Sequence, residues 1–271
     1  MKHLCNTAKV PALSSSSPKL LAHLQSEELS LKELVECLKL DACLGARLLH
    51  LANSPFYGIS RKVVSVGEAV IVLGLKQTRA LVQVEVMRST LSAFTWNIVP
   101  LQTFWHQSLA MAAHTQVLAR RLGLPESHAF TAGLVHNLGM LVLAQHNPTE
   151  YSELMVKQLG GQQLAMVERT LFKMDHGLVG AELLRTWNLP DQLCLAIEQQ
   201  YLETSGAVDD VLLMVLKTAH CFLSSASWTE LQVNTPKQLL DCCDVSEQSY
   251  AALDAEATTT TQGWLSLAGE F

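Results

Sequence analysis

The sequence predicts an all-α protein, and three observations lead to that fold class. Apolar residues recur every three or four positions along most of the chain, whereas the strict alternation typical of strands is nearly absent. Ser30 with Glu33, and Ser65 with Glu68, have the spacing of capping boxes, in which side chains satisfy amide groups at a helix start. Three of the eight prolines also stand near expected helix starts, where a missing amide hydrogen costs little.

The expected elements of the N-terminal part follow from these signals. The first capping box opens a helix whose apolar face runs from Leu31 to Leu38. Asp41 caps a second helix, which ends before the turn-rich segment 53–58. The second capping box opens a short helix that Gly74 ends, and residues 76–91 form another.

A second series of helices begins after Pro100. Helices are expected at 102–122, 126–146, 149–157, 162–171, 176–187, 190–201, 208–226 and 236–253. The polar run Thr258–Thr261 predicts a loosely held tail. We therefore expect two packed helical lobes, 8–98 and 99–226, followed by a C-terminal helical extension and tail at 227–271.

Composition and charge narrow the function classes. Hydrophobic residues make up 49% of the 271 residues, which is enough for a sizeable core without disulfides. The net charge is −6 and no dense basic block occurs, which argues against a nucleic-acid partner. The most apolar run, residues 129–144, is shorter than the ~20 residues of a membrane-spanning helix, so no membrane partner is expected. Seven cysteines without a CxxC pair, and an N-terminus without an apolar signal core, predict a cytoplasmic protein.

Short motifs occur in an order that resembles the HDOD (HD-related output domain) family. They include Val10-Pro11-Ala12-Leu13, Leu51-Ala52-Asn53-Ser54, Phe56-Tyr57-Gly58, Leu73-Gly74-Leu75-Lys76, Ala132-Gly133-Leu134 and Leu138-Gly139. The resemblance covers roughly residues 8–205, and the ordered set is far more specific than any one motif. Asn53, Ser54, Tyr57 and Gly58 form the family-signature corner, which fits a structural turn and is also a candidate contact for a partner.

HDOD domains are related to the HD phosphohydrolases, whose histidines and aspartates on neighbouring helices hold divalent metals. The resemblance implies that the second lobe is a degenerate HD-type helical fold. The paired His-Asp motif of that superfamily falls on His136-Asn137, and an earlier ligand histidine falls on Gln107. The last ligand aspartate falls on His220, and His176, after Asp175, resembles an additional ligand of the HD-GYP phosphodiesterases.

The same HD-GYP enzymes carry a histidine pair where this chain has Gln199-Gln200, so most of the positions other than His136 and His176 carry amides. An amide such as Asn137 is a poor ligand for a hard dication, so we expect no catalytic residues, no bound metal and no other cofactor. Two simpler interpretations also stay open. His136 fits a hydrogen-bonded core histidine, and Asp175 fits a helix N-cap rather than a base.

Three functional hypotheses follow. The main one is a non-catalytic regulatory module of bacterial signal transduction that binds a protein partner or a small ligand, such as a nucleotide, in the former metal cleft. The alternative is a weak metal-dependent phosphohydrolase that uses a divalent metal held by His136, Asp175, His176 and His220. Nucleic-acid binding is the third hypothesis and has the least support.

Overall fold

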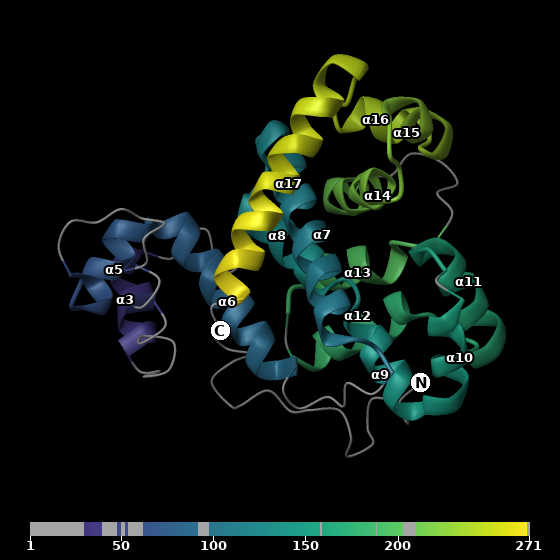
Figure 1. Ribbon diagram of the computed structural model, residues 1–271, viewed down its shortest axis with the longest axis horizontal. Helices are drawn as coiled ribbons and strands as arrows, with labels where there is room; N and C mark the ends of the chain where they lie inside the picture. The colour runs from purple at the N-terminus through teal and green to yellow at the C-terminus, as the bar shows by residue number, and fades with distance from the viewer. Residues whose placement is uncertain are drawn as a thin grey trace. The chain divides into compact units, whose positions relative to one another are not determined.

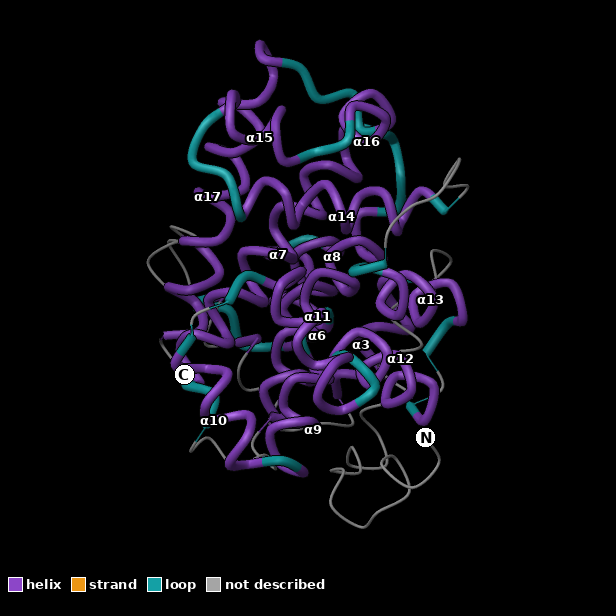
Figure 2. Tube along the Cα trace, turned by 90° about the vertical axis from the view of Figure 1, so that its right-hand side faces the viewer, coloured by secondary structure: helices purple, strands orange, loops and turns teal. Residues whose placement is uncertain are grey.

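The protein is all-helical wherever its structure is described. The computed structural model describes residues 30–39, 48–49, 52–53, 62–91, 98–157, 159–187, 189–202 and 210–269. Within these ranges every regular element is a helix, as Figure 2 shows, so the predicted all-α fold class is confirmed. None of the helices described is long and apolar enough to cross a membrane.

The chain divides into two compact units: the described residues from 30 to 91 belong to the smaller unit, and those from 98 to 269 belong to the larger one. The helices that follow residue 226 group with the larger, C-terminal unit rather than forming a unit of their own. The finer boundaries at 98/99 and 226/227, and the packing of the two lobes against each other, stay predictions.

The smaller unit is built on α3 (Leu31–Lys39), α5 (Val66–Leu73) and α6 (Leu75–Leu91). The capping box at Ser30 forms as predicted, and at Ser65 the hydroxyl caps the helix while the Glu68 carboxylate accepts from the amide of Val64 at 3.3 Å. The amide of Ser30 donates to the carboxylate of Glu33 at 2.9 Å, and the amide of Glu68 donates to the Ser65 hydroxyl at 3.1 Å. Gly74 ends α5 with a φ of 80°, a conformation that glycine adopts without strain.

The central helix of the larger unit is α7 (Leu101–Arg121). It packs against α8 (Glu126–Val135), α14 (Val211–Leu223) and α17 (Glu247–Gly269), and Figure 1 shows α17 lying along it. Because three helices cover α7, its residues from Ser108 to Ala119 are buried, with the exception of Gln116. The core of this unit lies between these helices.

The other helices of the larger unit are α9 (Leu138–His146), α10 (Pro148–Val156), α11 (Gly161–Phe172), α12 (His176–Thr186), α13 (Asp191–Gln199), α15 (Trp228–Asn234) and α16 (Lys237–Cys242). Helix α12 packs against both α9 and α13. The crossing of α9 and α12 depends on Gly139, where a Cβ atom would lie 1.9 Å from the backbone oxygen of His176. At Gly133, a Cβ atom would lie 2.6 Å from the backbone of Ala112, so glycine lets α8 approach α7 equally closely.

The structure corrects the expected helix at 126–146, which is two helices, α8 and α9. The chain turns at His136 and Asn137, where the His136 ring donates from Nδ1 to the carbonyl oxygen of Gly133 at 2.6 Å. This bond satisfies a carbonyl in the last turn of α8, so the helix can end inside an apolar stretch.

The expectations for the C-terminal part were also wrong in two respects. Residues 236–253 are divided between α16 and α17 by Asp244, whose φ of 51° is left-handed. The run Thr258–Thr261 lies inside α17 rather than in a loose tail. The hydroxyls of Thr259, Thr260 and Thr261 each donate at 2.8 Å to a carbonyl one turn earlier, and Trp264 packs on Phe130 of α8.

Candidate functional site

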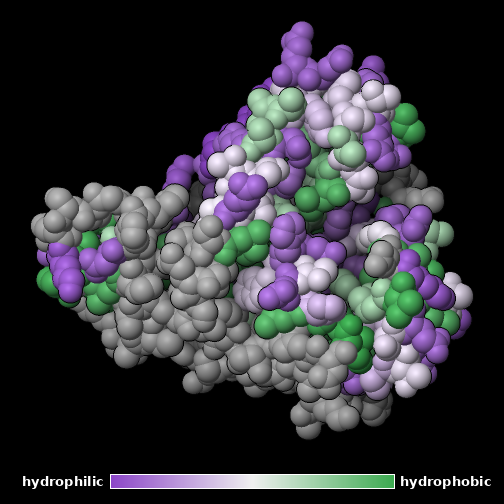
Figure 3. All heavy atoms as spheres, viewed as in Figure 1, coloured by the Kyte–Doolittle hydropathy of each residue, from purple (hydrophilic) through white to green (hydrophobic). Residues whose placement is uncertain are grey.

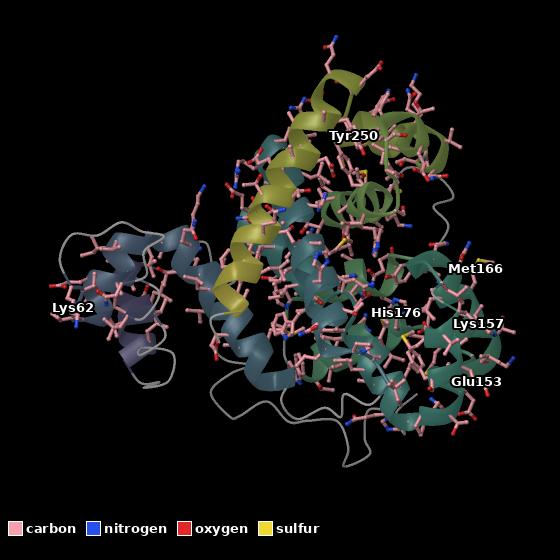
Figure 4. All side chains as sticks on the ribbon, viewed as in Figure 1. Lys62, Glu153, Lys157, Met166, His176 and Tyr250 are labelled. Atoms are coloured by element: carbon pink, nitrogen blue, oxygen red, sulfur yellow. The ribbon has the colours of Figure 1, made fainter. Side chains whose placement is uncertain are left out.

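Three histidines from different elements lie together in the larger unit. His136 follows the last residue of α8, His176 is the first residue of α12, and His220 lies in the last turn of α14. His136 and His176 are buried, whereas His220 is half-buried. Figure 4 shows His176 inside the unit, away from its outer surface. The structure thus brings together three of the six metal-pocket candidates.

An amide links His136 to His220. The two rings meet edge to face, with centroids 5.2 Å apart. Gln200 lies between them: its Oε1 accepts a hydrogen bond from Nε2 of His220 at 2.9 Å, and its Nε2 donates to the backbone oxygen of His136 at 3.0 Å. This bridge occupies Nε2 of His220, so that nitrogen is not available to a metal ion.

Burial keeps both of these histidines neutral. It lowers the pKa of His136 to about 3. Burial also lowers the pKa of His220 well below its ordinary value, and His136, His176 and Lys217 lower it further. The pair therefore carries no charge at neutral pH.

His176 is held by a buried carboxylate on α11. Oε2 of Glu168 accepts from the amide of His176 at 2.8 Å and from its Nδ1 at 2.6 Å. Oε1 of Glu168 accepts from the Tyr151 hydroxyl at 2.5 Å, and all three side chains are fully buried. Burial, followed by the charge of Glu168, raises the pKa of Tyr151, so this phenol stays a donor. Nε2 of His176 has no hydrogen-bond partner among the described residues.

Tyr201 completes the cluster. Its ring centroid lies 4.6 Å from that of His176 and 5.0 Å from that of His220. Its backbone oxygen accepts hydrogen bonds from Arg169 at 3.1 Å and from Gln162 at 3.2 Å. Tyr201 therefore ties the C-terminal end of α13 to α11 and separates two of the histidines.

The other metal-pocket candidates have different positions. Asp175 is the N-cap of α12, as the simpler interpretation predicts, because its Oδ1 accepts from the amide of Leu178 at 2.8 Å. Its Oδ2 accepts from Nε of Arg169 at 2.5 Å. Asn137 stands between α8 and α9, with its Oδ1 3.4 Å from the Tyr201 hydroxyl. Gln107 is exposed on α7 and takes no part in the cluster.

These residues do not fit a divalent metal. Within the described parts of the chain, no three histidine, cysteine, aspartate or glutamate side chains converge as ligands. The nearby carboxylates are already bonded, since Asp175 caps a helix and Glu168 binds Tyr151 and His176. Tyr201 stands between His176 and His220, and the amides Asn137 and Gln200 bind a hard dication weakly and cannot balance its charge.

A cleft of about 690 Å³ opens beside the cluster. Tyr201, Gln200 and His220 form its inner wall. Residues 160–163 at the start of α11, and Lys217 and Cys221 of α14, contribute to its sides. Figure 3 shows the surface hollowed between the parts of the unit that carry α11 and α14. A cleft of this volume is in the range of small-molecule sites.

The family-signature corner is described only at Asn53. Its Nδ2 donates to the backbone oxygens of Leu49 at 2.7 Å and Val63 at 2.9 Å, and its Oδ1 accepts from the Val63 amide at 2.8 Å. The side chain of Asn53 therefore links Leu49 to Val63, in the segment that precedes α5. Ser54, Tyr57 and Gly58 lie outside the described residues.

Sequence reasoning missed four residues of this site. No recognisable motif contains Glu168, Tyr151, Tyr201 or Lys217. The clearest signal in the sequence is Glu168 itself, a charged residue on the apolar face of a helix. Glu168 follows Ala165 and Leu164 on the buried side of α11, where a charged residue requires a partner.

The helical fold and the histidine cluster define an HD-related helical domain. The model of the HDOD domain family matches residues 10–202 of the 271 residues. The chain belongs to the HDOD domain family.

Several solved structures share the fold. An HDOD domain protein of unknown function from Geobacter sulfurreducens has a TM-score of 0.79 at 22% identity, over 98% of this chain and 96% of its own. A candidate signal transduction protein from Marinobacter aquaeolei VT8 has a TM-score of 0.78 at 22% identity, over 98% of this chain and 60% of its own. A candidate phosphohydrolase from Shewanella amazonensis SB2B has a TM-score of 0.71 at 23% identity, over 96% of both chains.

One relative is similar in sequence. An uncharacterized protein of Treponema pallidum (strain Nichols) is 25% identical over 193 residues, which is 67% of this chain and 36% of that protein. This chain therefore spans little more than a third of the length of that relative.

Proposed function

We propose that this chain is a non-catalytic regulatory module of bacterial signal transduction, which works in the cytoplasm through a small ligand or a protein partner. The Gln200 bridge is the observation that supports this most. Where an HD-type enzyme needs metal ligands, an amide joins His136 to His220. A metal ion bound to Nε2 of His220 would have to break this bridge, and the nearby carboxylates Asp175 and Glu168 are already bonded.

A binding role agrees with the rest of the site. The cleft has the volume of a small-molecule site, and its inner wall consists of the rigidly bonded residues Gln200 and Tyr201. Membership of the HDOD family, and the similar fold of a candidate signal transduction protein, agree with a signalling role. The competing proposal is a weak metal-dependent phosphohydrolase using His136, Asp175, His176 and His220.

Elemental analysis separates the two proposals. The protein is purified without chelator and measured before and after incubation with Mn²⁺ or Mg²⁺ and desalting. We expect less than about a tenth of an equivalent of metal in every sample, because the nearby carboxylates are already bonded and Nε2 of His220 is bonded to Gln200. Hydrolysis of bis(p-nitrophenyl) phosphate is expected to be the same for the wild type and His136→Ala.

A matched control makes the turnover test specific. His106 is exposed on α7, so His106→Ala removes an imidazole without touching the cluster. Stoichiometric metal, with turnover that His136→Ala abolishes and His106→Ala retains, would overturn the proposal and establish the phosphohydrolase.

A further inference from the structure

The cleft beside the histidines has an unusual charge for this chain. The sequence carries 25 acidic residues against 19 basic ones, a net charge of −6. No aspartate or glutamate is found among the described residues that line the cleft, but Lys217 is. A pocket whose described lining holds a lysine and no carboxylate favours an anionic ligand.

One wall of the cleft is the start of α11. Gly160 is the N-cap of this 12-residue helix, and residues 160–163 all line the cleft. Glycine has no side chain to cap a helix, and no side chain bonds to the cap here. The amides of Gly161, Gln162 and Gln163 lack intrahelical acceptors by helix geometry, so they present N–H groups and the positive end of the helix dipole.

The facing wall belongs to α14. Lys217 is only 9% exposed, and its ammonium group donates to the backbone oxygen of Leu202. A lysine has three N–H donors, so this bond leaves two for a ligand. Burial lowers the pKa of Lys217, and Arg169 lowers it further, so the ammonium gains stability from a nearby anion.

We propose that the cleft binds a phosphate-bearing small molecule, with a phosphate group seated between the start of α11 and Lys217. This inference rests on the proposed binding function and names its ligand class. The volume of about 690 Å³ exceeds that of a phosphate group and leaves space for an attached organic part. Lys217, His220, Ser224 and Asn234 lie beyond residue 202, where the family match ends, so the second wall is supplied by the segment that follows the matched region.

The decisive variant is Gly160→Asp. The backbone of Gly160 has φ −65° and ψ 158°, which any residue adopts, and no heavy atom lies within 4 Å of an added Cβ. An aspartate at an N-cap bonds to the amides of the first turn and stabilises the helix. The variant should therefore keep or raise the melting temperature, while its carboxylate occupies the proposed phosphate position.

Binding is measured by calorimetric titration of the full chain with inorganic pyrophosphate in metal-free buffer. We expect the wild type to bind, and Gly160→Asp and Lys217→Met to bind at least about tenfold more weakly, since each removes a favourable charge interaction. Gly160→Ala keeps the uncapped helix start, and Lys62→Met makes the same charge change on the smaller unit. Both should bind as the wild type does. Lys62 is labelled in Figure 4.

Two outcomes would overturn this inference. The first is that the wild type does not bind pyrophosphate. The second is that Gly160→Ala and Lys62→Met weaken pyrophosphate binding as much as Gly160→Asp and Lys217→Met do. Either result, together with the absence of metal and turnover, leaves the regulatory function standing. If Lys217→Met does not fold, the comparison of pyrophosphate binding by Gly160→Asp and by Gly160→Ala is sufficient to test the inference.

Discussion

Nδ1 of His176 lies 2.6 Å from Oε2 of Glu168, and neither side chain has any exposed surface. With the hydroxyl of Tyr151 on the second oxygen, this carboxylate joins α10, α11 and the first residue of α12. The position of His176 in the cluster therefore depends on a residue eight positions earlier in the chain.

We predict that Glu168→Gln destabilises the protein by about 3 kcal/mol, because one buried donor then faces the amide nitrogen of the new side chain. Urea unfolding measures the change. Glu153→Gln on the exposed side of α10 is the control and should change stability by less than about 0.5 kcal/mol. Equal stability of the two variants would contradict the role of Glu168.

The neutral histidines predict acid sensitivity. The pKa of His136 falls from 6.5 to about 3 on folding, so between these values the unfolded chain binds a proton that the folded chain does not. The contribution of His136 to the free energy of unfolding is therefore fully present above pH 6.5. Below pH 6.5 it is lost by about 1.4 kcal/mol per pH unit until the pKa of the folded state is reached. His220 acts in the same direction.

Urea midpoints at pH 7.5, 6.5 and 5.5 test this, because carboxylates titrate mainly below that range. We expect His136→Gln, which keeps a donor for Gly133, to show a shallower pH dependence than the wild type. His106→Ala, at an exposed position, should keep the slope of the wild type. A His136→Gln slope equal to that of the wild type would show that the pKa of His136 does not fall on folding.

Asp175 should behave as a cap. We predict that Asp175→Asn keeps an oxygen for the Leu178 amide and loses only the pairing with Arg169, whose side chain is one-third exposed. Asp175→Ala loses both the cap bond to the Leu178 amide and the pairing with Arg169. It should lower the free energy of unfolding by about 1 kcal/mol more than Asp175→Asn does. Thermal unfolding of the two variants checks the difference, and equal losses would mean that the cap bond contributes nothing.

Asn53 should hold its corner through both ends of its amide. Asn53→Asp keeps the shape but replaces the donor to the Leu49 and Val63 carbonyls with an acceptor, at an expected cost of about 1–3 kcal/mol. Hydrogen exchange gives a local readout. The Val63 amide should lose protection, whereas amides of α17 in the larger unit serve as an internal reference, and unchanged exchange at Val63 would refute this assignment.

Features that depend on neighbours in the sequence could be predicted. The capping box at Ser30, the caps at Ser65 and Asp175 and the stop at Gly74 involve residues within four positions of one another. The turn at His136 could not be predicted, because the sequence is apolar on both sides of it and the helical pattern continues without a break from residue 126 to residue 146.

The site itself depends on distant contacts. The order of motifs indicated His136, His176 and His220, and the structure brings these together. The resemblance indicated Gln200 as a lost ligand position, but the contacts that decide the chemistry of the histidines could not be predicted from spacing. Gln200 bonds to His136 across 64 positions, and the pairing of Glu168 with Tyr151 requires two helices to pack.

The backbone contact at Gly139 has a consequence for saturation mutagenesis. Even alanine there would force its methyl group into the carbonyl of His176, so every substitution should deplete the folded protein from the cell. A screen scored on signalling output alone would rank Gly139 beside ligand-binding residues. Measuring cellular abundance in parallel separates the two, because Gly139 variants lose abundance and output together, whereas Gly160→Asp keeps its abundance.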